Sequence, residues 1–262
     1  MIAARLPRPR ALLLDFGGVV VQTERRDSWV TDLATEVVAM LGAAGCAELT
    51  IDDVVRDVRA AAAADSAWKN AMSRLAAPAE LTWRMFWSEF VAADWPEQAR
   101  ALVTSQAWLL CRRQGELRST RVARNGIEDL LRGARERDIP VAIVSNAMSG
   151  IVHRDWLARA GLDKDLALQL YSDELGIRKP NPEMIRLACR ALAVAPSDAW
   201  YVGDNFDRDV VCGRRAGVGV TVLMTARSTH DRPFVVAQTP DAVVDDPAEL
   251  LRLLTLTDER HA

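Results

Sequence analysis

Short apolar runs alternate along this chain with longer segments that have helical spacing. Residues 11–14 form a continuous apolar run ending at Asp15, which is the pattern of a strand buried on both faces. After residue 120, further apolar runs follow segments with a helical pattern. The predicted strands there lie in PVAIVSN, LALQLYS, AWYVGD, VGVTVLM and AVVDD. This alternation predicts an α/β fold with a doubly wound, parallel, Rossmann-like sheet.

The stretch between about residues 28 and 113 has a different, helical pattern. Thr50 and Asp53 form a capping-box-like helix start, and Pro78 and Pro96 stand where further helices would begin. Six of the eight tryptophans fall in this stretch, where a shared apolar core is a simpler explanation than an aromatic binding site. We therefore expect an all-helical domain inserted after the first strand.

These two patterns predict a division of the chain into two domains. Residues 1–22 and 118–262 are assigned to the α/β core, and residues 23–117 to the inserted helical domain. Short polar segments at about 22–27 and 114–121 are the expected hinges between them.

Composition narrows the class of protein further. The 262 residues carry 33 basic and 36 acidic side chains, and this net charge of -3 favours neither nucleic acid nor an anionic membrane as partner. The four cysteines form no CxxC pair, which fits a reduced compartment. No apolar run approaches the roughly 20 residues of a membrane span or forms the core of a signal peptide. We expect a soluble, cytoplasmic monomer or homodimer.

Polar residues stand at or near the ends of four predicted strands. Asp15, Ser145 and Asp204 each end a strand, and Lys179 follows in the loop after LALQLYS. Ligands of open parallel sheets collect beyond the carboxyl ends of the strands, so these four side chains are expected to converge. Lysine is rare here, with three among the 33 basic residues, which mildly favours a specific role for Lys179.

Four motifs in this order resemble those of the haloacid dehalogenase-like hydrolases. They are DFGGV at residues 15–19, VSN at 144–146, RKPNP around Lys179, and VGDNFDRD at 202–209. Each motif alone is weak, but all four lie at predicted strand ends or in the adjoining loops. The helical insertion after the first motif is also similar to the mobile cap of that family.

This resemblance implies a phosphatase that acts on a small phosphorylated metabolite. Asp15 would be the nucleophile and would form an aspartyl-phosphate. Ser145 and the backbone N–H of Asn146 would bind phosphoryl oxygens, and Lys179 would pair with the phosphate. Taken alone, Ser145 fits a helix cap equally well. The substrate is not readable, because the cap sets specificity and its residues are generic helix and core types.

The resemblance also implies a magnesium site. Mg²⁺ would bind Asp15, the backbone carbonyl of Gly17 and Asp204, which are hard oxygen ligands. Asp209 would be a further metal ligand or a supporting group, and either it or Asp207 is expected to be a bystander. The three histidines have no metal-like spacing and are assigned no role.

Gly17 departs from the family pattern. Most phosphatases of the family have a second aspartate at this position, which serves as general acid and base. Losing such a group typically costs about 10²–10⁴-fold in rate. The acid could come from Glu24, Asp27 or the cap; alternatively, the protein cleaves carbon–phosphorus or carbon–halogen bonds, or binds a phosphorylated ligand with little turnover.

The sequence ranks these alternatives. Magnesium-dependent phosphoryl transfer requires the Gly203–Asp204 pair, whereas metal-free dehalogenation does not. Carbon–phosphorus hydrolysis in the family needs a cap lysine, and the context of Lys69, SAWKNAMS, does not resemble that motif. The main expectation is therefore a magnesium-dependent phosphatase.

Overall fold

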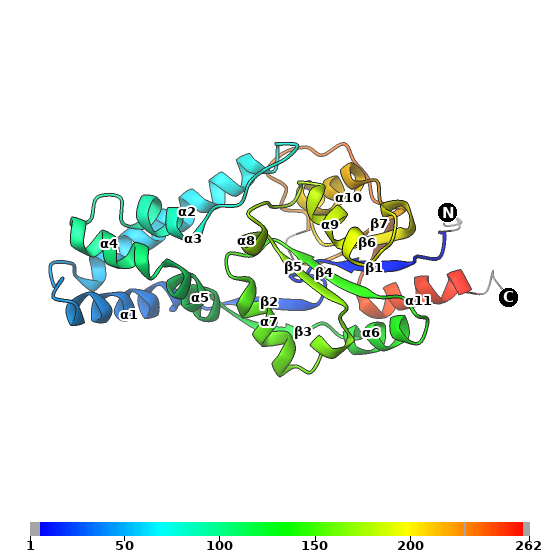
Figure 1. Cartoon of the computed structure of the whole chain (residues 1–262), viewed down its shortest axis with the longest axis horizontal. Coiled ribbons are helices and arrows are strands. Elements are labelled where there is room, and N and C mark those ends of the chain that lie inside the picture. Colours follow the sequence, from blue (N-terminus) through cyan, green and yellow to red (C-terminus); the bar gives the residue numbers. More distant parts are fainter. Residues whose placement is uncertain (1–5, 228, 259–262) are drawn as a thin grey trace.

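A computed structural model describes residues 6–227 and 229–258, and it contains a six-stranded parallel sheet (Figure 1). The strand order is β5-β4-β1-β6-β7-β8, so β1 lies in the middle between β4 and β6. The strands are β1 (Ala11–Leu14), β4 (Val141–Ser145), β5 (Leu168–Tyr171), β6 (Ala199–Gly203), β7 (Val220–Met224) and β8 (Ala242–Val244). This confirms the predicted doubly wound α/β fold.

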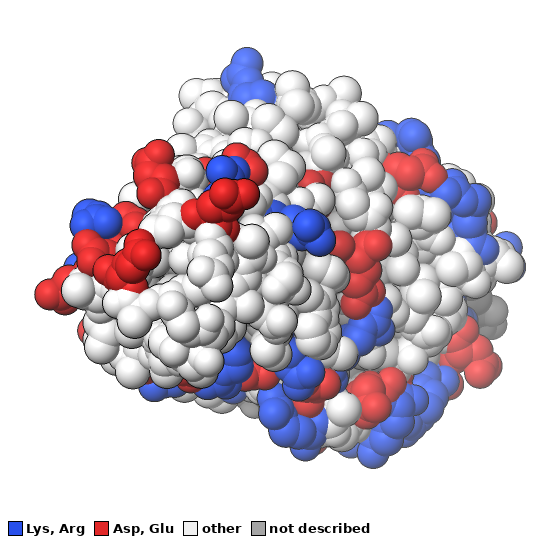
Figure 2. All heavy atoms as spheres, turned by 60° about the vertical axis from the view of Figure 1, so that its left-hand side comes forward, with Lys and Arg blue, Asp and Glu red and all other residues white. Residues whose placement is uncertain are grey.

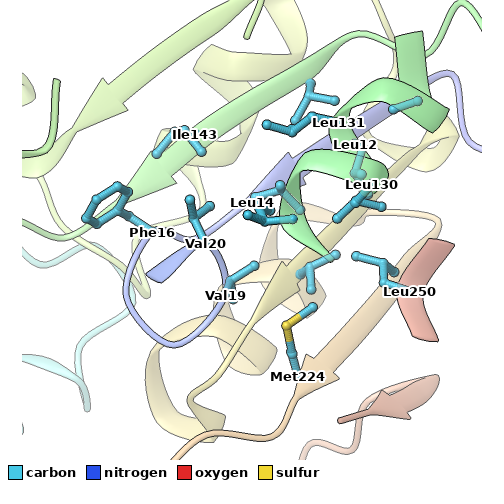
Figure 3. Close-up of a cluster of buried hydrophobic side chains, with 14 of the residues drawn as sticks. Leu12, Leu14, Phe16, Val19, Val20, Leu130, Leu131, Ile143, Met224 and Leu250 are labelled. Atoms are coloured by element: carbon cyan, nitrogen blue, oxygen red, sulfur yellow. The ribbon is translucent and has the colours of Figure 1, made fainter. Parts of the chain in front are cut away.

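Helices cover both faces of the sheet, which is why its central strands are apolar on both sides. Side chains of β1 and α6 pack together on one face (Figure 3: Leu12, Leu14, Leu130 and Leu131). Leu13 points to the opposite face and packs with Ile185 of α9. The core helices are α6 (Ile127–Arg135), α7 (Gly150–Arg159), α8 (Ser172–Leu175), α9 (Glu183–Ala191), α10 (Val211–Ala216) and α11 (Pro247–Asp258). A π-helix (Phe206–Val210) precedes α10, and short 3₁₀ turns lie at Asp163–Asp165 and Pro196–Asp198.

Residues 29–118, called the helical region below, extend away from the sheet (Figure 1). They comprise α1 (Trp29–Ala43), α2 (Ile51–Met72), α3 (Trp83–Met85), a π-helix (Phe86–Val91), α4 (Glu97–Ser105) and α5 (Ala107–Arg118). These elements share a core of their own that includes Trp29, Trp87 and Cys111. The capping box at the start of α2 is present, because the side chains of Thr50 and Asp53 each accept the other's backbone N–H.

Some predicted helix boundaries are wrong. No helix begins at Pro78; the next helix starts at Trp83, where the Thr82 hydroxyl accepts the Met85 N–H at 3.1 Å. The helix predicted after Pro96 is interrupted at Gln106 and continues as α5. The cap hydrogen bond of Thr82 decides the first of these positions, and helical spacing alone shows neither of them.

The two segments expected to be hinges, residues 22–27 and 114–121, overlap two paired strands, and residues 114–118 form the end of α5. β2 (Val21–Arg25) runs antiparallel to β3 (Ser119–Ala123) and pairs with it from Val21↔Ala123 to Arg25↔Ser119. The helical region is therefore joined to the sheet by a two-stranded ribbon rather than by two separate polar linkers.

The surface carries charges of both signs. Figure 2 shows acidic and basic side chains side by side on the face that includes the helical region. Several of them pair, as Arg113 does with Glu36 at 2.5 Å and Arg56 with Asp53 at 2.8 Å. Among residues 6–227 and 229–258, no helix has the length and apolar character needed to cross a bilayer.

Candidate active site

The polar strand ends meet in one pocket at the carboxyl edge of the sheet. Asp15 follows β1, Ser145 ends β4 and Asp204 follows β6, and these three strands are adjacent. Lys179 enters from the loop between α8 and α9. The pocket has a volume of about 530 Å³, and its lining includes all seven residues predicted for the site, namely Asp15, Gly17, Ser145, Asn146, Lys179, Asp204 and Asp209.

Lys179 lies at the centre of the polar contacts in this pocket. Its Nζ is 2.9 Å from Oδ1 of Asp15, 2.6 Å from Oδ1 of Asp209 and 2.9 Å from the hydroxyl of Tyr201. Burial disfavours the charged amine, but the carboxylates of Asp15 and Asp209 outweigh it and raise the pKa of Lys179. The side chain is therefore a fixed cation beside the carboxylate of Asp15.

Both carboxylate oxygens of Asp209 are occupied by protein donors. Oδ1 accepts from Lys179 and from the hydroxyl of Tyr201, the latter at 2.7 Å, and Oδ2 accepts the N–H of Asn205 at 3.0 Å. A Cβ at Gly203 would overlap the Asp209 side chain, so this close approach requires glycine. Asp209 therefore holds Lys179 in place.

Three carboxylates crowd together at the base of the pocket. Asp15, Asp204 and Asp209 each offer an oxygen, and these atoms lie within 4.8 Å of one another. Burial raises the pKa of Asp204 to about 8, and the charges of Asp209 and Asp15 add to the shift. Burial also raises the pKa of Asp15, against the opposing effect of Lys179. One lysine does not neutralise three acids.

This cluster fits a divalent cation with a preference for oxygen. A cation would favour the ionised form of Asp204, whose pKa is raised in its absence. The nearby Oδ1 of Asn205, which also lines the pocket, is buried and has no hydrogen-bond partner among the described residues. The donor set is thus of the hard type that Mg²⁺ binds.

The first motif forms a tight turn below this cluster. The N–H of Gly18 donates to the carbonyl of Val21 at 2.8 Å. Gly18 has a φ of +72°, and a Cβ there would overlap the side chain of Asp204, so only glycine fits. Gly17 is different, because a Cβ at this position would have no described atom within 4 Å. Space for a side chain at Gly17 is therefore present.

Sequence reasoning missed two of the contacts that build the site. The side chain of Asn146 forms two hydrogen bonds with the backbone of Lys179, at 2.7 and 3.1 Å, and so joins the two loops. Tyr201, which contacts both Lys179 and Asp209, lies within an apolar strand. A hydroxyl in the apolar run AWYVG was the only signal that a polar partner lies nearby.

The other candidate acids and the histidine differ in whether they line the pocket. Glu24, on β2, lines the pocket, whereas Asp27 and Asp207 lie outside its lining. His153 also lines it; its ring stacks on Phe16 with centroids 4.2 Å apart, and burial lowers the pKa of His153 to about 3. This histidine is neutral near pH 7 and cannot supply a proton there as an imidazolium.

Two similar proteins of known name are phosphatases. A glyceraldehyde 3-phosphate phosphatase of Methanopyrus kandleri is 34% identical over 105 residues, which are 39% of this chain and 45% of that protein. A phosphoserine phosphatase of Thermus thermophilus is 42% identical over 91 residues, 35% of this chain and 36% of that protein. The chain thus spans less than half the length of either relative.

Solved structures share the fold over almost the whole chain. A HAD phosphatase from Thermococcus onnurineus superposes with a TM-score of 0.60 at 16% identity, covering 93% of this chain and 97% of that one. A 2-haloacid dehalogenase from Pseudomonas syringae pv. Tomato gives a TM-score of 0.60 at 16% identity, with coverages of 96% and 99%. The profile described as "haloacid dehalogenase-like hydrolase" matches residues 9–217, and this chain therefore belongs to that family of hydrolases.

Proposed function

We propose that this enzyme is a magnesium-dependent phosphatase that hydrolyses small phosphomonoesters through an aspartyl-phosphate on Asp15. The observation that carries this proposal is the buried contact of Asp15 with Lys179 beside a cluster of three carboxylates. The phosphatase names of the relatives from Methanopyrus kandleri and Thermus thermophilus support it.

In this proposal Asp15 attacks phosphorus with a carboxylate oxygen. The oxygen–phosphorus bond to the leaving group breaks, and water later hydrolyses the aspartyl-phosphate to release phosphate and restore Asp15. Lys179 and Ser145, together with the N–H of Asn146, bind phosphoryl oxygens and offset the charge that develops on them. Asp209 keeps the ammonium of Lys179 directed at this point.

Asp15, Asp204 and the backbone carbonyl of Gly17 would hold Mg²⁺, with Asp209 as a supporting group through Lys179. When bound, the ion reduces the repulsion between the anionic nucleophile and the anionic phosphate.

Residues 23–117 are proposed to be the cap over this pocket. The two strands of the ribbon contribute to the pocket wall the residues Gln22, Thr23, Glu24, Ser119 and Arg121.

Two alternatives are less well supported. The Lys69 ammonium bonds Asp65 at 2.6 Å and lies outside the lining of the main pocket, which disfavours an imine-forming, carbon–phosphorus hydrolase. The carboxylate cluster disfavours metal-free carbon–halogen cleavage, although a dehalogenase shares the fold. A third alternative is that the protein binds phosphorylated ligands with little turnover. Hydrolysis assays on phosphomonoesters with and without Mg²⁺ distinguish it from catalysis.

The affinity for Mg²⁺ is expected to depend on pH. In the metal-free protein the pKa of Asp204 is raised from 3.8 to about 8, so this carboxyl is protonated below that pH and must lose its proton to bind the ion. Mg²⁺ affinity should therefore rise with pH, by up to about tenfold per unit, and level off above about pH 8. Calorimetric titration of Mg²⁺ between about pH 6 and pH 9 measures this. A flat profile over that range would contradict the loss of a proton from Asp204 when the ion binds.

Arg121 is expected to select the leaving group. Its side chain lines the pocket and donates to the backbone carbonyls of Gly115 and Ser119, and among the described residues no carboxylate lies at ion-pair distance from it. A guanidinium in this position suits a carboxylate on the substrate. We expect 2-phosphoglycolate to be hydrolysed about tenfold more efficiently than 2-hydroxyethyl phosphate, and Arg121→Gln to remove most of that preference. Equal kcat/KM values for the two esters with the unaltered enzyme would refute this role.

A further inference from the structure

One carboxylate of the helical region is connected to both loops of the proposed phosphate site, to one directly and to the other through Ser172. Glu80 lies in the segment between α2 and α3, and its side chain is 5% exposed. Its Oε1 is 3.2 Å from Nη1 of Arg178, and its Oε2 accepts the hydroxyl of Ser172 at 2.5 Å. Both partners belong to the α/β core.

Each of these partners is next to a residue of the phosphate site. Arg178 directly precedes Lys179 in the chain. The Oγ of Ser172 accepts the N–H of Ala147 at 2.9 Å, and Ala147 directly follows Asn146. Glu80 therefore contacts the residue next to Lys179. It is also linked to the loop after β4 through the hydroxyl of Ser172.

The backbone around Glu80 is fixed to the same two loops. The N–H of Glu80 donates to the carbonyl of Gly176 at 3.0 Å, and Ala79 forms an isolated antiparallel bridge with Ile177. Trp83, a little further along, donates its indole N–H to the carbonyl of Met148 at 2.8 Å. The helical region thus has a further attachment to the core besides the β2–β3 ribbon.

The Glu80–Arg178 pair is deeply buried, with side-chain exposures of 5% and 1%. The guanidinium of Arg178 also lies over the ring of Trp68 of α2, 5.3 Å from the ring centroid. Removing one member of a buried ion pair leaves the other as an uncompensated charge, which is strongly destabilising. The loop that carries Arg178 also carries Lys179, so we expect the loss of Glu80 to displace this lysine.

We propose that Glu80 is a positioning residue, through which docking of the helical region fixes Lys179 and the loop after β4 for phosphate binding. This inference rests on the proposed function, because it concerns the same phosphate site. It does not place Glu80 in contact with the substrate. Small displacements of binding groups are costly in rate, so losing this contact should lower phosphate affinity and kcat as well as stability.

The test compares Glu80→Gln with a control variant, Asp155→Asn. The control breaks another ion pair between the helical region and the core, Arg112–Asp155 at 2.8 Å between α5 and α7, which contacts neither phosphate loop. The measurements are the Kd of inorganic phosphate in the presence of Mg²⁺, kcat and KM on an aryl phosphate, and Tm.

We expect Glu80→Gln to weaken phosphate binding and lower kcat by about tenfold each, while Asp155→Asn leaves both near the unaltered values. If Glu80→Gln does not fold, the double variant Glu80→Gln/Arg178→Met leaves no unpaired buried charge. It still lacks the ion pair that ties the Lys179 loop to the helical region, so it should show the same two losses. Unchanged phosphate affinity and kcat in the folded variant would overturn the inference, as would equal losses in the control.

The phosphate measurement also separates this inference from the proposed function. If the unaltered protein binds phosphate but hydrolyses no phosphomonoester, the proposed function fails, and the phosphate affinities of the variants still decide the role of Glu80. If it hydrolyses phosphomonoesters and Glu80→Gln behaves like the control, only the positioning role fails.

Discussion

Asp15→Asn is expected to lower kcat for phosphomonoester hydrolysis by about 10⁴-fold or more. The asparagine amide has nearly the same shape but is a poor nucleophile, so the aspartyl-phosphate cannot form. The fold should persist, because Lys179 keeps its 2.6 Å contact with Asp209 when the charge on Asp15 is lost. Steady-state hydrolysis of an aryl phosphate, with Tm measured alongside, shows whether activity is lost without unfolding.

Asp94→Asn is a suitable control for this experiment. Asp94 is exposed in the loop before α4, outside the lining of the pocket, so its replacement should leave kcat within a factor of about two. Residual activity of Asp15→Asn within about tenfold of the unaltered enzyme would rule out Asp15 as the nucleophile.

Gly17→Asp is expected to raise kcat/KM on alkyl phosphates by about 10²-fold or more. An alkoxide leaves poorly unless it is protonated, and no side chain at Gly17 supplies that proton. A Cβ at Gly17 would meet no described atom within 4 Å, and the φ of this residue lies outside the left-handed region, so aspartate fits the turn. The leaving oxygen of an aryl phosphate needs little protonation, so kcat/KM on aryl phosphates should rise much less.

The measured quantity is the ratio of kcat/KM for an aryl and an alkyl phosphate, before and after the substitution. We expect the unaltered enzyme to favour the aryl ester and Gly17→Asp to narrow the gap. Rapid alkyl ester hydrolysis by the unaltered enzyme would mean that another acid is in place. Glu24 is then the first candidate, since it lines the pocket and Asp27 does not.

The sequence predicted the sheet and the strand-end residues well because both depend on local patterns. Apolar runs such as residues 11–14 are buried on both faces, and a polar residue that ends such a run lies at the carboxyl edge. Asp15, Ser145 and Asp204 lie together because β1 sits between β4 and β6. Four ordered motifs then identified the family that the comparison over residues 9–217 confirms.

Features that depend on long-range pairing were not predictable in this way. The polar segment at β2 looks like a linker, and it becomes a strand because residues 119–123, almost a hundred positions later, pair with it. Pro78 begins no helix because the segment around it lies along residues 176–178 of the core instead.

The same limit applies to the polar contacts inside the site. The bonds of Asn146 to the backbone of Lys179, and of Tyr201 to Asp209, join residues from separate loops and strands. Glu80 gave no signal at all in the sequence, since an acidic residue two positions after a proline is usually an exposed loop residue. Its burial against Arg178 follows only from how the helical region meets the core.

The most direct test of this account is to look for the covalent intermediate itself. The enzyme would be mixed with an aryl phosphate and Mg²⁺, quenched in acid within the first turnovers, digested, and analysed by mass spectrometry. We predict one added phosphoryl group on the peptide that contains Asp15, lost on brief treatment with hydroxylamine and absent from Asp15→Asn. A phosphoryl group found on another residue, or rapid turnover with no phosphorylated peptide at any quench time, would contradict the proposed mechanism.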